Sequence, residues 1–508
     1  MSYLLKIKNA TFRKFQYTVF QDTDWEMQAG ENWMIVGDSG SGKTTFLEIL
    51  EGRVLKTKGE VICNFTGADA GNPPYFAGNP PYFVGNPPCS AGNPPYSAGN
   101  PPCFAGNPSG HVASVYFNDP SLNYGDFYYQ QRYNASETDN VVTVRNFLKL
   151  NDANGFPELQ ALGVAHLLDT EIIKLSNGQF KKMLIVKALM KKPRLLLLDN
   201  LYTGLDRQAR DYITHTVREI TSLGTNVVIV ADDRHIPDSI SNVMEIENFS
   251  IKRTSNRKDY IPVRCHRQAG LPVLPPAPEK TFETAVRLDG VNIVYSNKPV
   301  VNQVKWTINH GDKWALTGPN GAGKTMLLSL IFADNPQAYS NSIILFDRKR
   351  GTGESIWDIK DKIGFVSPEM HLYFNRNKTC REIALSALSE NPYRKIRVTD
   401  EIEELADNLF DYFSIAKICR DLFQHVSTGQ QNIVLLIRAL IKNPPVLALD
   451  EPFQGMDCVS VDSAKYLLDE YCHNRTLIFV SHQPEEFPSC IDKYFCIENG
   501  KCVNVNKK

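Results

Sequence analysis

Short runs of apolar residues recur along the chain and predict strands that are buried on both faces. The clearest runs lie at 33–36, 195–198, 227–231, 314–317 and 446–449. Between them, stretches such as 144–150 and 181–190 have the apolar spacing of helices with one buried face. Strands that alternate with helices favour an α/β fold with mainly parallel sheets.

A glycine-rich loop follows two of these runs. Residues 37–44 read GDSGSGKT and residues 318–325 read GPNGAGKT, and both match the pattern Gly-x-x-x-x-Gly-Lys-Ser/Thr. Between a strand and a helix, such a loop directs backbone N–H groups at phosphates, its lysine neutralises the β and γ charges, and its threonine can ligate Mg²⁺. The predicted nucleotide-binding residues are Gly37, Asp38, Ser39, Gly40, Ser41, Gly42, Lys43, Thr44, Thr45, Gly318, Pro319, Asn320, Gly321, Ala322, Gly323, Lys324, Thr325 and Met326.

The two loops belong to a duplicated unit. Matching residues in the first part of each copy are 281 positions apart: Trp25 and Trp306, Trp33 and Trp314, Lys43 and Lys324. Later matches are 251 positions apart: Gln179 and Gln430, Asp199 and Asp450. A constant offset on each side of one break is typical of a repeated domain. We predict a first domain over 1–250, a linker over 251–282 and a second domain over 283–508.

The break coincides with an insert in the first copy. Residues 71–108 repeat the unit Gly-Asn-Pro-Pro followed by three variable residues, with two prolines and a glycine in every seven positions. This composition excludes a coiled coil and favours a surface loop. The alternative is a partner-binding segment that uses aromatic side chains such as Tyr75 and Phe76. The linker is basic at its start and then proline-rich, as expected of a spacer.

Composition narrows the class of protein. A net charge of −1 gives no electrostatic argument for nucleic acid as the main ligand. The apolar runs are far shorter than the roughly 20 residues that a membrane-spanning helix needs. The eleven cysteines contain no Cys-x-x-Cys pair, which argues for reduced thiols and against zinc or iron–sulfur sites. The first residues lack the pattern of a signal peptide, so we expect a cytoplasmic protein.

Each copy also places a Ser-x-Gly-Gln segment, at 176–179 and 427–430, ahead of a helical stretch and an apolar run that ends in aspartate. Such a run predicts a buried strand that presents a carboxylate at its C-terminal tip, where it can hold Mg²⁺ through water. We predict that Asp199 acts with Thr44, and Asp450 with Thr325, at two magnesium sites.

With these motifs in place, the sequence resembles the ATP-binding-cassette (ABC) ATPases over the whole chain apart from the insert and the linker. The resemblance implies two P-loop nucleotide-binding domains in tandem, each with a mixed, largely parallel sheet and a helical subdomain, that bind ATP and Mg²⁺. It also implies a head-to-tail arrangement in which the Ser-x-Gly-Gln signature of each copy completes the ATP site of the other. The implied signature residues are Ser176, Gly178, Gln179, Ser427, Gly429 and Gln430.

The same resemblance assigns further roles. Phe15 and Tyr295 match the aromatic residues that stack on adenine, although packing at a strand edge is the alternative. Asp206 and Asp457 match the D-loop aspartates. Gln130 or Gln131 can supply the glutamine that links Mg²⁺ to a membrane partner, but the second copy reads FVSP at 365–368 and lacks it. That loss argues against ordinary coupling to a transporter.

By the same resemblance, the two sites are not equivalent. Glu451 stands where the family places the carboxylate that orients the attacking water, and His482 stands where a histidine contacts the γ-phosphate. The first copy has Asn200 and Asp232 at these positions. Asparagine cannot accept a proton, and aspartate would repel the γ-phosphate. We predict that Lys324, Glu451 and His482 form the one efficient hydrolysis site, and that the other site binds and holds MgATP.

Residues 337–341 (QAYSN) and 345–360 (LFDRKRGTGESIWDIK) closely resemble the ModF or photorepair family, which is associated with molybdate transport. We predict a monomeric tandem ATPase that pairs its two halves within one chain and works as an ATP-gated clamp. The first alternative is an ATPase subunit that energises a membrane permease of the sugar- or metal-oxyanion-import type, at the inner face of the plasma membrane. The second is an ABC-F-like ribosome-associated factor, although the linker is shorter and richer in proline than in that group.

Overall fold

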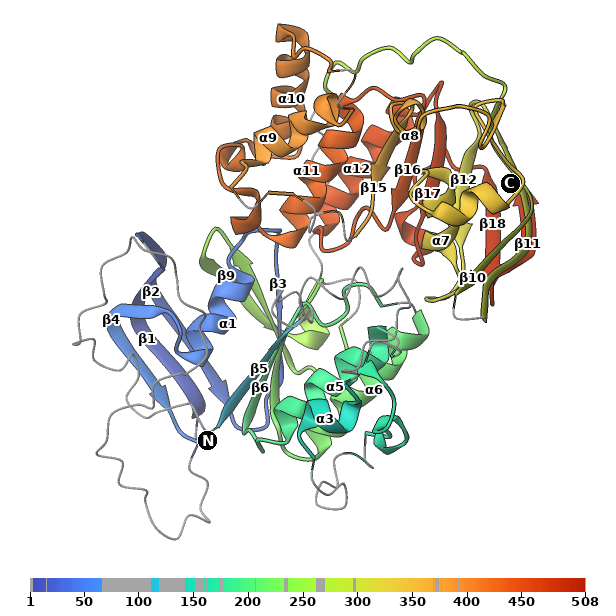
Figure 1. Ribbon diagram of the computed structural model, residues 1–508. Helices are drawn as coiled ribbons and strands as arrows, with labels where there is room; N and C mark the ends of the chain where they lie inside the picture. The colour runs from blue at the N-terminus through green and yellow to red at the C-terminus, as the bar shows by residue number, and fades with distance from the viewer. Residues whose placement is uncertain are drawn as a thin grey trace, which may run out of the picture.

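A computed structural model describes the protein over residues 3–14, 16–65, 111–117, 142–150, 159, 162–172, 175, 177–205, 207–232, 236–261, 270–295, 298–368, 370, 374–375, 377–391, 393 and 395–507. These residues form two lobes, the first half of the chain below the second half in the view of Figure 1. The α/β class is confirmed. The repeat at 71–108 and the candidate residues Gln130 and Gln131 lie outside the described residues.

The first half is built on a six-stranded sheet in the order β5-β6-β7-β3-β8-β9. All neighbours in it are parallel except β8 and β9. A second, antiparallel sheet has the order β2-β1-β4. The strands are β1 (Tyr3–Lys14), β2 (Tyr17–Gln28), β3 (Trp33–Val36), β4 (Leu55–Cys63), β5 (Val112–Tyr116), β6 (Leu195–Asp199), β7 (Asn226–Val230), β8 (Asn242–Glu247) and β9 (Ser250–Asn256). The helices are α1 (Lys43–Glu51), α3 (Val144–Leu148), α5 (Asn177–Leu189) and α6 (Arg207–Ser222), with 3₁₀ turns η4 (Ala165–Leu167) and η6 (Arg257–Asp259).

The second half repeats this plan, with sheets in the orders β15-β16-β17-β12-β18-β19 and β11-β10-β13-β14. Its strands are β10 (Thr284–Tyr295), β11 (Lys298–Asn309), β12 (Lys313–Thr317), β13 (Ile343–Leu345), β14 (Arg348–Lys349), β15 (Ile363–Val366), β16 (Val446–Asp450), β17 (Thr476–Val480), β18 (Lys493–Glu498) and β19 (Lys501–Lys507). Its helices are α7 (Lys324–Ile331), α8 (Ile356–Lys360), α9 (Cys380–Leu385), α10 (Asp400–Tyr412), α11 (Thr428–Ile441) and α12 (Cys458–Tyr471). Short 3₁₀ turns are η7 (Pro336–Ser340), η9 (Ser386–Ser389), η10 (Ala416–Ile418), η11 (Phe423–His425) and η12 (Pro484–Glu486).

Both faces of each six-stranded sheet are covered. In β6, Leu195 and Leu197 pack into one apolar cluster, whereas Leu196 and Leu198 pack into the cluster on the opposite face. All four side chains are fully buried. This is the environment that the uninterrupted leucine run predicts, because successive residues of a strand point to opposite faces.

The structure corrects one predicted boundary. The linker was predicted to begin at 251, but β9 continues to Asn256 and pairs with β8 in the sheet of the first half. The basic residues there are strand residues: Lys252 and Arg253 both form ion pairs with Glu245 of β8. At the other end, Phe282 is buried in a core cluster of the second half, directly before β10.

Within the ranges that the structure describes, no helix combines the length and the apolarity that crossing a bilayer would require.

Candidate nucleotide sites between the two halves

The two glycine-rich loops have the same backbone conformation. Gly37 has a φ of 144° and Gly318 a φ of 142°, in a region that side chains rarely allow. A Cβ atom would lie 2.1 Å from Ile246 O at the first position and 2.0 Å from Ile497 O at the second. Glycine is therefore required at the start of both loops, and each loop leads directly into a helix, α1 or α7.

The loop lysines are held in matching ways. Lys43 Nζ donates to the carbonyl oxygens of residues 37 and 38, both at 2.7 Å. Lys324 Nζ donates to those of residues 318 and 319, at 2.7 and 3.1 Å. Burial lowers the pKa of Lys43, while the charges of Asp457 and Asp199 raise it in part. Both cations lie where the loop backbone curves around them, as phosphate binding needs.

Each loop threonine meets the aspartate that was predicted to be its partner. Thr44 Oγ1 donates to Asp199 Oδ2 and Thr325 Oγ1 donates to Asp450 Oδ2, both at 2.9 Å. Asp199 Oδ1 is buried and accepts no hydrogen bond. Burial raises the pKa of Asp199 to about 6, against the lowering effects of the Thr44 hydrogen bond and the Lys43 charge. A buried, unpartnered carboxylate oxygen beside a hydroxyl fits a hard cation such as Mg²⁺, which prefers oxygen ligands.

The first loop lies against the signature segment of the second half. Ser39 N donates to Asp457 Oδ2 at 2.9 Å, and Ser39 Oγ donates to Gly455 O at 3.2 Å. A Cβ atom on Gly40 would lie 2.6 Å from Gln430 Nε2, and one on Gly429 would lie 2.3 Å from Ser39 Oγ. The structure thus brings the first loop together with Ser427–Gln430 and the D-loop aspartate across the seam between the halves. Ser427 caps α11 through a reciprocal pair of bonds with Gln430, which fixes the signature at the helix N-terminus.

The second loop also faces the first half. Asn320 Nδ2 donates to Gly204 O at 3.4 Å, just before the predicted D-loop position 206. Gly178 packs against Ala209 of its own half, where a Cβ atom would lie 3.0 Å from the alanine Cβ. Ser176, Asp206, Phe15 and the side chain of Tyr295 lie outside the described part of the structure. Their predicted roles, and the approach of Gly178 and Gln179 to the second loop, stay predictions.

Glu451 and His482 form a pair beside the second loop. His482 Nδ1 and Glu451 Oε1 are 2.9 Å apart, and the histidine side chain is 6% exposed. Burial lowers the pKa of His482, but the hydrogen bond and charge of Glu451 and the charge of Glu486 outweigh it, so the pKa is raised. His482 Nε2 is buried and has no hydrogen-bond partner among the described residues. The hydrogen bond within the pair therefore uses one carboxylate oxygen of Glu451 and one ring nitrogen of His482. It does not use the second oxygen of the carboxylate or the second nitrogen of the ring.

The matching positions of the first half have the same backbone but different chemistry. Asn200 has a φ of 53° and Glu451 a φ of 46°, each directly after a buried strand. Asp232, the counterpart of His482, is exposed at the end of β7. Among the described residues, the first half therefore offers no proton acceptor at the position of Glu451 and no imidazole at the position of His482, while His235, three residues after Asp232, lies outside the described residues.

Two side chains near the seam were not predicted. Lys181 is buried in α5 and donates to the carbonyls of Asn200, Leu201 and Thr203 at 3.3, 3.0 and 2.7 Å. Arg210, in the first turns of α6, is close enough to His482 of the other half to lower its pKa, and Arg210 Nε is buried without a partner. The sequence could have drawn attention to both residues. The 251-residue offset pairs these two cations with the uncharged Asn432 and Val461 of the second half, so the charge at both positions differs between the copies.

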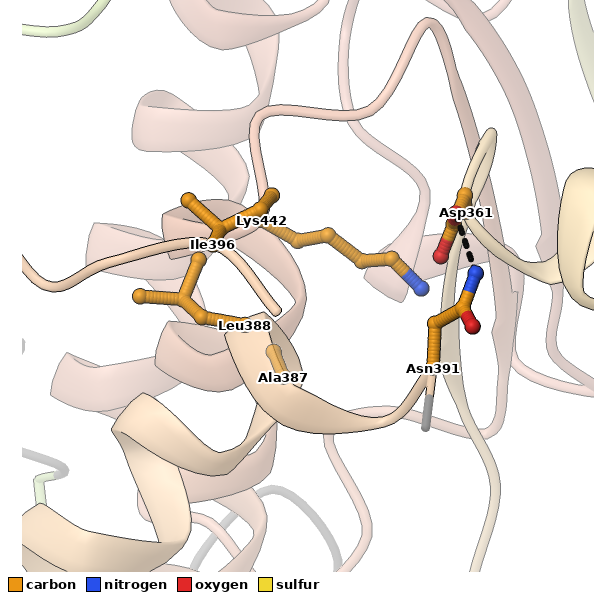
Figure 2. Close-up of a pocket in the computed structure, with 6 residues that line it drawn as sticks. All are labelled: Asp361, Ala387, Leu388, Asn391, Ile396 and Lys442. Atoms are coloured by element: carbon orange, nitrogen blue, oxygen red, sulfur yellow. Dashed lines mark hydrogen bonds between the residues drawn. The ribbon is translucent and has the colours of Figure 1, made fainter. Parts of the chain in front are cut away.

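A separate pocket of about 120 Å³ lies in the second half, lined by Asp361, Ala387, Leu388, Asn391, Ile396 and Lys442. Figure 2 shows Lys442 reaching toward the hydrogen-bonded pair Asn391 and Asp361. Lys442 Nζ also donates to Lys360 O and to Glu390 Oε2, at 2.7 and 2.9 Å. Lys442 follows the C-terminal end of α11, whereas the signature lies at its N-terminal end. This pocket is therefore separate from the nucleotide sites.

Comparison with known proteins identifies the family. A protein-family model described as "ABC transporter" matches residues 20–74 and 301–454, which include both loops. An uncharacterized ABC transporter ATP-binding protein of Schizosaccharomyces pombe is 30% identical over 99% of this chain and 99% of its own length. The chain belongs to the tandem ABC ATPases. The ABC transporter ATP-binding protein ModF of Escherichia coli is 29% identical over 96% of this chain and 95% of its own length.

The paired arrangement of ABC domains also has a structural counterpart. The structure of ribosome-bound archaeal Pelota and ABCE1 matches 98% of this chain and 79% of its own chain, with a TM-score of 0.61 and 15% sequence identity. At this identity the likeness concerns the fold alone. The two-domain architecture and the ATPase class predicted from the sequence are confirmed.

Proposed function

We propose that this protein is an ATP-driven clamp that hydrolyses ATP efficiently only at the site of the second loop. The observation that carries the proposal is the hydrogen bond between His482 and Glu451, directly after the strand that ends in Asp450. In-line hydrolysis needs a group that orients water and a group that stabilises the γ-phosphate. The second half has both, and the first half has Asn200 and Asp232 instead.

In the proposed reaction, Glu451 accepts a hydrogen bond from the attacking water and takes its proton as the new bond to the γ-phosphorus forms. The bond between that phosphorus and the bridging oxygen breaks, which releases ADP and phosphate. His482 Nε2 donates to a γ-phosphate oxygen, and Lys324 neutralises the β and γ charges. Mg²⁺, held by Thr325 and Asp450, would neutralise the phosphate oxygens.

The contacts across the seam support the clamp. Asp457 of the second half accepts a hydrogen bond from the backbone of the first loop, and it is also the N-cap of α12. A change in the position of that loop therefore acts directly on the N-terminus of α12. The first site keeps Lys43, Thr44 and Asp199 in the same geometry as the second site. We therefore propose that it binds MgATP, turns it over slowly and helps to keep the halves together.

The test compares two substitutions at matching positions. Glu451→Gln should lower ATP turnover by about 10²- to 10³-fold while ATP still binds, because a general base typically contributes that much. Asn200→Ala, at the same place in the first half, should change turnover less than about twofold. Steady-state phosphate release and equilibrium nucleotide binding measure the two effects. Equal losses from both substitutions would refute the asymmetry and leave a two-site ATPase.

A second candidate function is that of an ATPase subunit that energises a membrane permease of the sugar- or metal-oxyanion-import type. The observation in its favour is that the E. coli relative is described as an ABC transporter ATP-binding protein. The full-length Glu451→Gln protein, incubated with ATP, should then co-purify with one membrane permease from native membranes. Slow turnover that no membrane fraction stimulates would favour the free clamp.

A further inference from the structure

The linker lies along the outer side of the second half, and the exposure of its residues follows a regular period. It crosses the top of the upper lobe in Figure 1 as a yellow-green segment without helix or strand. Every third residue of the segment is exposed: Gly270, Val273, Pro276 and Glu279. The two residues that separate each of these from the next are half-buried. An exposure period of three is that of a polyproline II helix, and the proline content of 270–279 favours this conformation.

Side chains of the second half fasten this segment through its carbonyl groups. Arg475 Nη2 donates to Pro275 O at 2.9 Å, and Asn443 Nδ2 donates to Pro276 O at 3.2 Å. The Arg475 guanidinium lies 3.9 Å from the centre of the Tyr471 ring. The linker residues Leu271 and Leu274 pack against the main apolar cluster of this half. This is the usual way to bind a polyproline II segment: apolar contacts on one side and donors to free carbonyls.

The first half has a groove at the same place. Asn226 N donates to Arg194 O at the start of β7, just as Thr476 N donates to Pro445 O at the start of β17. Lys192 and Asn443, which end the matching helices, both have a φ of 50°. In the first half these elements surround a groove of about 350 Å³.

The groove has a mixed lining, in which four apolar side chains lie beside Lys192, Arg194 and Thr225. Leu162, Leu189 and Ile220 line it at the positions that match Phe413, Leu440 and Tyr471, 251 residues on. Leu223 also lines it, and its counterpart, counted back from β17 because this turn is one residue shorter in the second half, is His473. Leu223 is 63% exposed, an unusual state for a leucine beside a groove. In the second half the linker lies over Asn443 and Arg475 of the corresponding surface and leaves His473 exposed, whereas no described residue of this chain lies in the groove of the first half in the place of the linker.

The rim of the groove is basic. Lys191, Lys192 and Arg194 are exposed, and no ion pair links them to a carboxylate among the described residues. An occupant with acidic side chains would therefore be favoured. The repeat at 71–108 is the one other proline-rich part of this chain, but it contains no charged residue. Charge complementarity thus favours a different protein as the source.

We propose that this groove of the first half binds a proline- and leucine-containing segment of a partner protein in the polyproline II conformation, with acidic residues beside the prolines. The linker of the second half is the internal example of such a segment on the same surface. The partner would be attached to the first half at a distance from the seam, so its binding does not require the ATP site to be open.

The probe is a fluorescein-labelled peptide with the sequence of residues 270–279, GLPVLPPAPE, and binding to the full-length protein is followed by fluorescence anisotropy. We expect saturable binding that Leu223→Glu weakens about tenfold or more, because burial of one leucine side chain is worth about 1.5–3 kcal/mol. The matched control is His473→Glu, at the corresponding exposed position of the second half, which should leave binding unchanged. A peptide with lysine in place of its glutamate should bind about two- to fivefold more weakly.

Three results would overturn the proposal. No saturable binding would show that the groove does not accept such a segment. Loss of binding with His473→Glu but not with Leu223→Glu would place the peptide on the second half, in competition with the linker. Tighter binding after deletion of 71–108 would identify the repeat as the natural occupant and remove the argument for a partner. None of these measurements depends on ATP hydrolysis, so failure here leaves the proposed ATPase function untouched.

Discussion

The two halves of this protein have nearly the same scaffold around their glycine-rich loops but different side chains directly after the strand-end aspartate and beside it. Both loops require glycine at their first position, and both join a threonine to a strand-end aspartate at 2.9 Å. Beyond that aspartate, one half has Glu451 paired with His482 and the other has Asn200 and Asp232. Under the function proposed above, binding and hydrolysis of ATP depend on separate residues, so one can be kept while the other is lost.

A second difference lies behind the same two loops. In the second half, Asn432 Nδ2 donates to Gln454 O at 2.6 Å. In the first half, Lys181 occupies the matching place, reaches the matching carbonyl of Thr203 and two further carbonyls, and is fully surrounded by protein. Burial and the charge of Arg210 lower the pKa of Lys181 to about 7. The loop after β6 is therefore joined to α5 by three hydrogen bonds from this position, whereas the loop after β16 is joined to α11 by one.

The largest effect is expected from removing that lysine. Lys181→Met should lower the free energy of unfolding of the first half by about 2–4 kcal/mol, because three carbonyls lose a shared donor. Asn432→Leu, which removes one donor from one carbonyl, should cost about 1 kcal/mol. Urea unfolding and hydrogen exchange of the amides in 200–205 and 451–456 measure both. Equal costs in the two halves would contradict the difference in loop restraint.

A smaller effect is expected at the seam. Asp457→Asn should keep the cap of α12, since asparagine is an equally good N-cap, but should weaken the bond from Ser39 N. A bond to a charged acceptor exceeds one to a neutral acceptor by about 1 kcal/mol, so the Kd for ATP should rise about fivefold. Ser460→Ala, which removes a hydroxyl that donates to the same carboxylate, is the control and should change the Kd little. Unchanged affinity in Asp457→Asn would show that this contact does not contribute to ATP binding.

The smallest effect concerns the charge that the first half presents to His482. Arg210→Gln should raise the pKa of His482, because it removes a positive neighbour that disfavours the imidazolium form. The titration midpoint of this histidine, followed by NMR, should rise by less than about one pH unit. Arg218→Gln, an exposed arginine of the same helix that is not among the charges named for His482, should leave that midpoint where it is. A midpoint that falls in Arg210→Gln would contradict the proximity across the seam.

Much of this could be predicted from sequence because the determinants are local. Some residues indicate their own conformation or burial without reference to distant parts of the chain. These are the glycines at 37 and 318, the uninterrupted run 195–198 and the aspartates that end β6 and β16. The 281- and 251-residue offsets then aligned the two copies and placed Glu451 against Asn200. His482 and Asp232 are 250 positions apart, and they correspond because each lies two residues after matching strands, β17 and β7. These predictions need only the spacing of residues along a strand, a loop and a helix.

The family resemblance implied that the halves meet head to tail, but only the tertiary structure decided which individual residues make contact and which strands pair. The basic stretch after 250 has the composition of a linker, yet its pairing with β8 makes it a strand. The contact of Ser39 with Asp457 joins residues that are hundreds of positions apart, and the proximity of Arg210 to His482 exists only because the halves pack together. The same holds for the groove at Leu223, which is recognisable because the linker covers its counterpart. Local sequence fixes the conformation of a segment, but long-range contacts depend on the packing of the whole chain, to which every element contributes.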